Sequence, residues 1–168
     1  MKNKLILIFV LLAVIAVSGC IDSSVDNINK VMPDVSNDIV NGDNHYNDAV
    51  NLVNSKNYDD ALDKANSAKN EFEDSIKKLD EAKKNFDGIN DEVIINYINT
   101  VSDEVGLKNN ATNYLILSIN SYKTGDNETG NSYALQANSL MDRAIEFQDV
   151  RVKLVEDNPD LFKKRFHL

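Results

Sequence analysis

The stretch YDDALDKANSAKNEFEDSIKKLDEAKKNF, residues 58–86, decides the fold of this chain. Its apolar and small side chains recur every three or four residues, which places them on one face of an α-helix. These residues are Tyr58, Ala61, Ala65, Ala68, Phe72, Ile76, Leu79, Ala82 and Phe86. The outer face carries acid–lysine pairs spaced four residues apart, an arrangement that stabilises helices: Asp60–Lys64, Glu73–Lys77, Asp74–Lys78 and Asp80–Lys84. A long amphipathic helix is therefore predicted here.

A second apolar pattern with helical spacing precedes this stretch. It consists of Val35, Ile39, Gly42, Tyr46, Ala49 and Val53. Pro33 suits the first turn of the corresponding helix, where its missing N–H costs nothing. We expect a break at residues 55–57, with Ser55 or Asn57 as the cap of the following helix.

Two further patterns follow the stretch. The third helix is indicated by an apolar pattern at Ile94, Ile98, Val101, Val105, Leu115, Ile119 and Tyr122. The fourth helix is indicated by a pattern at Tyr133, Ala137, Leu140, Ala144, Phe147 and Leu154. Arg151 interrupts this fourth pattern. Because the third pattern weakens over residues 106–112, we predict a kink or break near Gly106. Breaks are also predicted at residues 88–90, where Gly88 fits a C-cap and Asn90 and Asp91 a new start, and at residues 123–127. Pro159 should end the fourth helix near Asn158, leaving one more turn or short helix after it.

These patterns together indicate an all-α domain. No segment alternates apolar and polar residues in the manner of a strand. Short connections between long helices make neighbouring helices antiparallel. The predicted architecture over residues 34–158 is an antiparallel up-down four-helix bundle, followed by a basic-aromatic tail at residues 159–168.

A second architecture competes with the bundle. Residues 56–68, KNYDDALDKANSA, resemble the turn and second helix of a tetratricopeptide repeat, with Tyr58, Ala61, Ala65 and Ala68 in the expected places. The preceding helix departs from that family, because His45 and Asp48 occupy positions where large apolar residues are expected. The sequence ANSA at 65–68 is similar to ANSL at 137–140. The resemblance implies a pair of similar helical hairpins in place of a bundle.

The N-terminus carries a different signal. Lys2 and Lys4 precede an unbroken apolar run over residues 5–17, which is shorter than the roughly 20 residues that span a bilayer but suits a signal peptide. The sequence VSGC at 17–20 resembles the lipobox of prokaryotic surface lipoproteins, archaeal ones included. The resemblance implies removal of residues 1–19 and lipidation of Cys20. The alternative is an uncleaved membrane anchor with an incidental cysteine.

This resemblance also predicts a location. Residues 20–33 would form the lipidated cysteine and a polar tether, and the helical domain would be anchored in the cell membrane and face the outside of the cell. Two lipid chains anchor a protein stably, whereas one chain binds reversibly. Because Cys20 is the single cysteine, an intramolecular disulfide is excluded.

Charge limits the possible partners. The chain has 27 acidic and 18 basic residues, a net charge of −9, and removal of residues 1–19 would take away two lysines and no acid. This balance argues against nucleic acid as a partner and against electrostatic attraction to anionic lipid headgroups.

The sequence gives no evidence of catalysis. His45 and His167 have no cysteine or second histidine nearby to complete a metal site. There is no nucleophile elbow, phosphate-binding glycine loop or Glu-x-x-His motif. In residues 125–130, GDNETG, Gly130 falls where a calcium loop needs an oxygen ligand. We expect neither an enzyme nor a cofactor or metal.

Two features remain as candidate sites. Asn110 and Asn127 begin glycosylation sequons within segments predicted to be irregular. The tail contains Phe162, Lys163, Lys164, Arg165 and Phe166, a basic-aromatic cluster in an acidic protein. It is interpreted either as a turn packed on the end of the bundle or as a docking segment for an acidic partner or a membrane surface.

Two functions are consistent with these features. The first is a lipid-anchored binding or protein-interaction module at the cell surface. The alternative is a structural or stress-related envelope lipoprotein without a discrete ligand site. Because six tyrosines cannot all be core residues, a concave groove lined by them would favour the first, and a convex charged surface the second.

Overall fold

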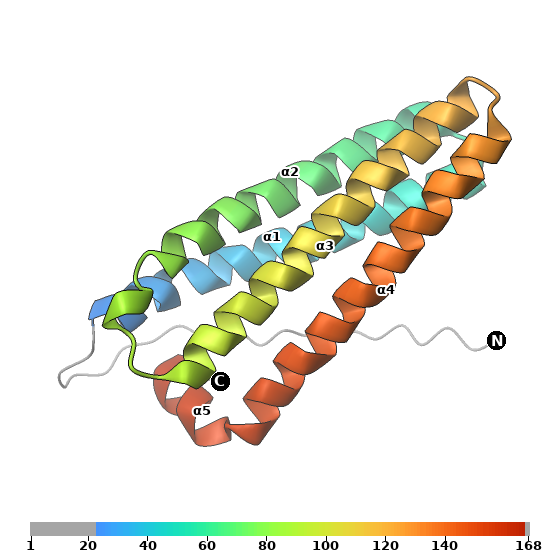
Figure 1. Cartoon of the computed structure of the whole chain (residues 1–168). Helices are drawn as coiled ribbons and strands as arrows, with labels where there is room; N and C mark the ends of the chain where they lie inside the picture. The colour runs from blue at the N-terminus through green and yellow to red at the C-terminus, as the bar shows by residue number, and fades with distance from the viewer. Residues whose placement is uncertain (1–22, 167–168) are drawn as a thin grey trace.

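A computed structural model describes residues 23–166, with side chains described for residues 27–162. Four long helices follow one another: α1 (Ser23–Asn54), α2 (Tyr58–Lys83), α3 (Glu92–Lys123) and α4 (Asn127–Asp157). A 3₁₀ turn, η1 (Phe86–Gly88), lies between α2 and α3, and a short helix, α5 (Pro159–Phe166), follows α4. Figure 1 shows the four long helices running up and down beside one another. Residues 23–166 contain no strand, and the predicted all-α bundle is confirmed.

The helix boundaries follow local chemistry. The side chain of Asp91 caps α3 by accepting a hydrogen bond from the Val93 N–H at 3.0 Å, and Asp126 caps α4 by accepting one from the Thr129 N–H at 3.1 Å. Gly125, in the loop between α3 and α4, has a φ of +82°, which glycine adopts without strain. The predicted breaks at residues 55–57, 88–90 and 123–127 are confirmed.

The core lies along the inner faces of α1, α2 and α3. Its fully buried members include Ile28, Val35, Ala49, Ala61, Ala65, Ala68, Phe72, Leu79, Ile94, Ile98, Val105 and Ile119. Phe72 lies against Gly42 so closely that a Cβ on Gly42 would stand 2.5 Å from Cε1 of the ring. Gly42 of α1, which has no side chain, therefore leaves room for Phe72, the largest buried residue of α2.

The predicted polar tether at residues 20–33 is wrong from Ser23 onward, because α1 begins there. Ile28 and Met32 are buried and extend the apolar pattern of Val35 and Ile39 by two turns. Pro33 consequently lies inside the helix and not in its first turn. A proline there removes one backbone hydrogen bond, a cost that the burial of Ile28 and Met32 offsets.

The predicted kink or break near Gly106 is also wrong. α3 is one continuous helix of 32 residues. Its apolar pattern is weakened over residues 106–112 because Lys108 and Thr112, although polar, are buried among core residues. A glycine in a helix interior costs about 1 kcal/mol relative to alanine, and the packing of this helix outweighs that cost.

The four helices do not enclose the core equally. α1 packs on α2, α2 on α3 and α3 on α4, whereas α1 and α4 make almost no direct backbone contact within the described part of the chain. Figure 1 shows α4 lying against α3 and diverging from α1. The residues that α4 buries are spaced seven apart: Gly130, Ala137, Ala144 and Arg151. The backbones of α1 and α4 are therefore spaced more widely than those of the other neighbouring helices, and buried side chains such as that of Arg151 fill the space between them; we call this side of the bundle the open side.

The tetratricopeptide-like alternative is not supported by the helix lengths. The long helices contain 26 to 32 residues each, whereas a tetratricopeptide repeat fits two helices into about 34 residues. Ala65 and Ala137, the equivalent residues of the two similar tetrapeptides, are both buried. Their similarity thus reflects close helix packing at small residues in both hairpins.

Candidate functional site

Four charged side chains meet between α1, α3 and α4. On α3, Glu104 and Lys108 form an ion pair at 3.1 Å between Oε1 and Nζ. The Nε of Arg151, from α4, donates to Oε2 of Glu104 at 2.9 Å. The Nζ of Lys108 donates to Oδ2 of Asp43, from α1, at 2.7 Å. We call Asp43, Glu104, Lys108 and Arg151 the charged network.

The charged network is buried except at Asp43, which is partly exposed, and it is electrically balanced. Glu104 is fully buried, and Lys108 and Arg151 are exposed by only 2% and 6%. Two acids and two bases compensate one another, as buried charges require. Burial raises the pKa of Asp43, although Lys108 opposes that shift. Burial alone would lower the pKa of Arg151, but the nearby Glu104 and Tyr97 outweigh it and the pKa is raised, so its guanidinium stays charged.

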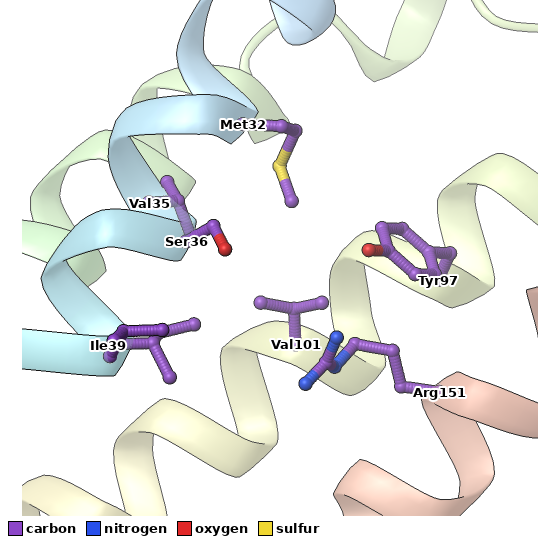
Figure 2. Close-up of a pocket in the computed structure, with 8 residues that line it drawn as sticks. Met32, Val35, Ser36, Ile39, Tyr97, Val101 and Arg151 are labelled. Atoms are coloured by element: carbon purple, nitrogen blue, oxygen red, sulfur yellow. The ribbon is translucent and has the colours of Figure 1, made fainter. Parts of the chain in front are cut away.

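A small pocket opens beside the charged network. It is lined by Met32, Val35, Ser36, Ile39 and Val40 of α1, Tyr97 and Val101 of α3, and Arg151 of α4. Figure 2 shows the Ser36 hydroxyl, the Tyr97 ring and the Arg151 guanidinium around the opening, with apolar side chains between them. Its cavity volume of about 20 Å³ suits a single water molecule. The pocket is therefore too small to be a site for an organic ligand.

The outer rim of the open side carries apolar side chains. Val40 of α1 lines the pocket and is 42% exposed. On α4, Val152 directly follows Arg151. Ile145 lies seven residues before Val152 and therefore on the same face of the helix, and Ile145 and Val152 are both exposed. Asp142, one turn before Ile145 on α4, is close enough to Tyr46 of α1 to influence its pKa, and this proximity indicates that this flank of α4 lies on the side of α1.

Acidic side chains accompany these apolar residues. Asp43 of α1 is partly exposed, and the exposed Asp142 of α4 is close enough to Tyr46 of α1 to contribute, after burial, to raising its pKa to about 12. We call Val40, Asp43, Asp142, Ile145 and Val152 the α1/α4 face. It spans two helices that are not packed on each other. Asp43 belongs to both the face and the charged network, whose other three members are buried.

Cys20 and the rest of the predicted lipobox lie outside the described residues. Asn110 is exposed but lies within α3, and its sequon partner Thr112 is buried, where its Oγ1 donates to the Lys108 carbonyl at 2.8 Å. The irregular segment expected around Asn110 is thus wrong. Asn127 is exposed and is the first residue of α4, directly after the loop. Modification of either residue stays a prediction.

The basic-aromatic tail is largely the short helix α5. Phe162 is buried, and its ring meets that of Tyr97 in a T-shaped arrangement with centroids 5.2 Å apart. α5 also contacts α1, and Figure 1 shows it at the end of the bundle where α1 begins. Phe162 therefore belongs to the core and is not exposed for docking. Lys163, Lys164, Arg165 and Phe166 lie on the same helix, beyond the described side chains.

The tyrosines do not line a groove in the described structure. Tyr46 and Tyr97 are buried. The other four are half-buried and form two ring pairs, Tyr58 with Tyr122 and Tyr114 with Tyr133. His45 is half-buried on α1 beside Tyr46, and His167 lies outside the described residues. Among the described residues, no group of side chains has the makings of a metal site, and no helix is long and apolar enough to cross a membrane.

The sequence interpretation missed the charged network. Arg151 interrupts the fourth apolar pattern, but the spacing of that pattern points to no partner for it. Glu104 and Lys108 are four residues apart on α3. Glu104 lies between the apolar residues Val101 and Val105, and Lys108 lies after Val105, before the next apolar position of the helix. An acid–base pair on the inner face of one helix, opposite a basic residue on the inner face of the next, is the signal that could have revealed the network.

No protein-family model, curated protein or solved structure matches this chain.

Proposed function

We propose that the protein is a lipid-anchored interaction module outside the cell, which presents the α1/α4 face to a protein partner. The observation that carries this proposal is the open side of the bundle. Val40, Ile145 and Val152 remain exposed there, although closer packing of α1 on α4 would have covered them. Exposed apolar residues gathered over neighbouring elements are typical of interaction sites.

The charged network supports this role because it keeps the open side in a defined shape. It ties α4 to α3 through Arg151 and Glu104, and α3 to α1 through Lys108 and Asp43. Bulky polar side chains thus fill the space that the apolar residues of a closed bundle would occupy. A surface held in a fixed shape binds with a smaller loss of conformational entropy than a flexible one.

The position of the proposed anchor fits a short connection to the membrane. Only Ile21 and Asp22 separate Cys20 from the first residue of α1. Three residues span at most about 11 Å, so lipid on Cys20 would hold the beginning of α1 near the bilayer. α1 contains 32 residues and is about 48 Å long at 1.5 Å per residue. The bundle would therefore stand as a rod whose side faces are accessible.

The test is chemical cross-linking in cells that produce the protein, followed by detergent solubilisation and affinity capture. The matched variant carries Ile145→Ser and Val152→Ser. We expect one partner protein to be captured with the wild-type protein in a constant ratio, and we expect the variant to be captured without that partner. Wild-type protein that is recovered from the membrane without any partner in a constant ratio would favour the alternative, a structural envelope lipoprotein.

A further inference from the structure

The chain contains two glycosylation sequons, and the fold places them in unlike surroundings. Asn127 begins α4, directly after the loop that joins this helix to α3, and its side chain is exposed. Its backbone N–H donates to the Gly125 carbonyl at 3.0 Å, and no hydrogen bond holds its side-chain amide within the described part of the chain. The nitrogen atom to which a glycan would be attached is therefore accessible in the folded protein.

A sequon requires a serine or threonine as well as the asparagine, so an enzyme that reads the motif must contact both side chains. In an α-helix, residues two apart project about 200° apart around the axis, on nearly opposite sides of the helix. Each sequon must therefore leave the helical conformation before both of its side chains can be contacted together. The cost of this local unwinding differs between the two sites.

At Asn127 the unwinding is confined to the first turn of α4. The backbone N–H of Thr129 donates to the exposed carboxylate of Asp126 at 3.1 Å, and water can replace this contact. The first residue that α4 buries is Gly130, which lies so close to the Tyr122 ring that an added Cβ would stand 2.6 Å from it. The first turn can thus unwind while the rest of α4 stays packed on α3.

At Asn110 the same unwinding would disrupt the core. Asn110 and Thr112 lie in the interior of α3, far from both ends of this 32-residue helix. Ala111 and Thr112 are fully buried, and Oγ1 of Thr112 donates to the Lys108 carbonyl at 2.8 Å. Buried helix interiors open far more rarely than helix ends. The folded protein therefore keeps the hydroxyl of this sequon out of reach.

Asn127 also has a defined place in the molecule. The ring of Tyr122, at the end of α3, stacks on the ring of Tyr58, at the start of α2, with centroids 5.8 Å apart. The α1–α2 and α3–α4 connections consequently lie side by side, and Figure 1 shows them at the end of the bundle opposite to the first turns of α1. With lipid on Cys20, this end would point away from the membrane, and a glycan there would leave the sides of the bundle uncovered.

We infer that Asn127 is an N-glycosylation site and that Asn110 is not, because the fold exposes the first sequon at a helix end and buries the hydroxyl of the second. The donor is an oligosaccharide linked through a diphosphate to a polyprenyl lipid. Nδ2 of Asn127 bonds to C1 of the first sugar, and the bond between C1 and the diphosphate oxygen breaks. The electron pair of that bond leaves with the diphosphate, and the amide proton passes to a base of the transferase.

The experiment presents both sequons to a membrane fraction that contains an N-glycosylation transferase and its lipid-linked oligosaccharide. The fraction is chosen because it glycosylates two synthetic peptides, residues 109–123 and residues 124–143, which are also the tryptic fragments that contain Asn110 and Asn127. The test acceptor is the folded chain of residues 20–168 with Cys20→Ser. Mass spectrometry after trypsin digestion reads each site separately. We expect modification of the folded chain to be at least about tenfold greater at Asn127 than at Asn110.

Variants near Asn127 provide matched controls. Thr129→Ala removes the sequon but keeps the asparagine, and it should abolish the modification, whereas Thr129→Ser keeps the sequon and should preserve it. Asp126→Ala removes the cap of α4 and should raise the initial rate at Asn127 by up to about fivefold. A lower rate with Asp126→Ala would contradict the unwinding step.

Two results would overturn the inference: equal modification of Asn110 and Asn127 in the folded chain, or an unmodified Asn127 in a folded chain whose peptide 124–143 is glycosylated. The inference rests on the proposed location outside the cell and adds a modification to the proposed interaction function. Because the assay needs neither the lipid anchor nor a partner, its failure would leave the interaction function standing. A failure to capture a partner would likewise leave the glycosylation site standing.

Discussion

Arg151 of α4 donates a hydrogen bond from Nε to Oε2 of Glu104 on α3 at 2.9 Å, and both side chains are buried. Glu104 also pairs with Lys108, which in turn binds Asp43 of α1. One ion pair between two helices is thus extended to a third helix. Since α1 and α4 scarcely touch, these polar contacts hold the open side of the bundle together.

Arg151→Met should destabilise the protein by about 3 kcal/mol. The substitution keeps an apolar side chain of similar length but leaves Glu104 buried with one basic partner in place of two. Urea unfolding monitored by far-ultraviolet circular dichroism measures the loss. Adding Glu104→Gln should recover part of it, because the unbalanced charge is then removed. A midpoint equal to that of the wild type would show that the ion pair does not stabilise the packing of α4.

Gly42 and Gly106 should respond in opposite ways to substitution by alanine. Both lie within helices, where alanine is favoured by about 1 kcal/mol. At Gly106 the added Cβ would meet no atom within 4 Å apart from its chain neighbours and the backbone of its own helix, so Gly106→Ala should stabilise the protein by up to that amount. At Gly42 the Cβ would lie 2.5 Å from the Phe72 ring, and overpacking of about 1–3 kcal/mol should make Gly42→Ala destabilising. Thermal unfolding of the two variants compares them directly. Equal stabilisation by both would mean that Phe72 is not packed on Gly42.

Phe72→Ala should cost about 3–5 kcal/mol, because the ring is fully buried on α2 and its loss leaves a cavity against Gly42. Leu135→Ala is the control, since Leu135 is 67% exposed and its truncation should change the free energy of unfolding by no more than about 0.5 kcal/mol. An unfolding midpoint that Phe72→Ala leaves unchanged would be incompatible with the packing of α1 on α2.

Tyr46 should make stability fall at alkaline pH. Its pKa rises from 10.0 to about 12 on folding, mainly through burial and further through Asp142. Below pH 10 both states keep the proton. Between pH 10 and 12 the unfolded state releases it more readily, so the free energy of unfolding declines, by about 3 kcal/mol for a shift of this size. Tyr46→Phe should remove this part of the decline, as urea unfolding at a series of pH values would reveal.

The same substitution should be harmless at neutral pH. The Tyr46 hydroxyl is buried and has no hydrogen-bond partner in the described structure, so its removal relieves an unfavourable desolvation. We expect Tyr46→Phe to leave stability equal or slightly higher at pH 7. A marked loss at that pH would indicate a hydrogen bond to the hydroxyl, and an unchanged alkaline decline would assign that decline to other groups.

Much of the fold could be predicted because the helical spacing of most core residues is visible in the sequence. Phe72, Leu79, Ile94 and Ile98 lie on regular helical repeats, and Asp91 and Gly125 mark the ends of helices by their local chemistry. The start of α1 was missed because Pro33 is usually a helix boundary. Packing of Ile28 and Met32 overrides that local preference, and local sequence does not reveal how much apolar area a distant helix will cover.

The site was harder to predict for a related reason. Glu104, Lys108 and Arg151 are residue types that are mostly exposed, and their burial depends on partners that are distant in sequence. Asp43 and Lys108 are 65 residues apart. The open side depends on how far α1 and α4 stand from each other, and this distance follows from the bulk of the side chains between them. The apolar pattern of a single helix reveals neither the pairing of Asp43 with Lys108 nor the spacing between α1 and α4.

The proposed role depends on a bundle held at the membrane through Cys20, and mass spectrometry of the mature N-terminus tests that tether most directly. We expect a wild-type protein that begins at residue 20, carries lipid on it and remains with membranes after a carbonate wash. Cys20→Ser should leave the helical bundle intact, because residues 23–166 contain no cysteine, and should either retain the signal segment or release the protein. A wild-type protein that begins at Met1 with an unmodified Cys20, together with a serine variant that stays in the membrane as before, would contradict lipid anchoring.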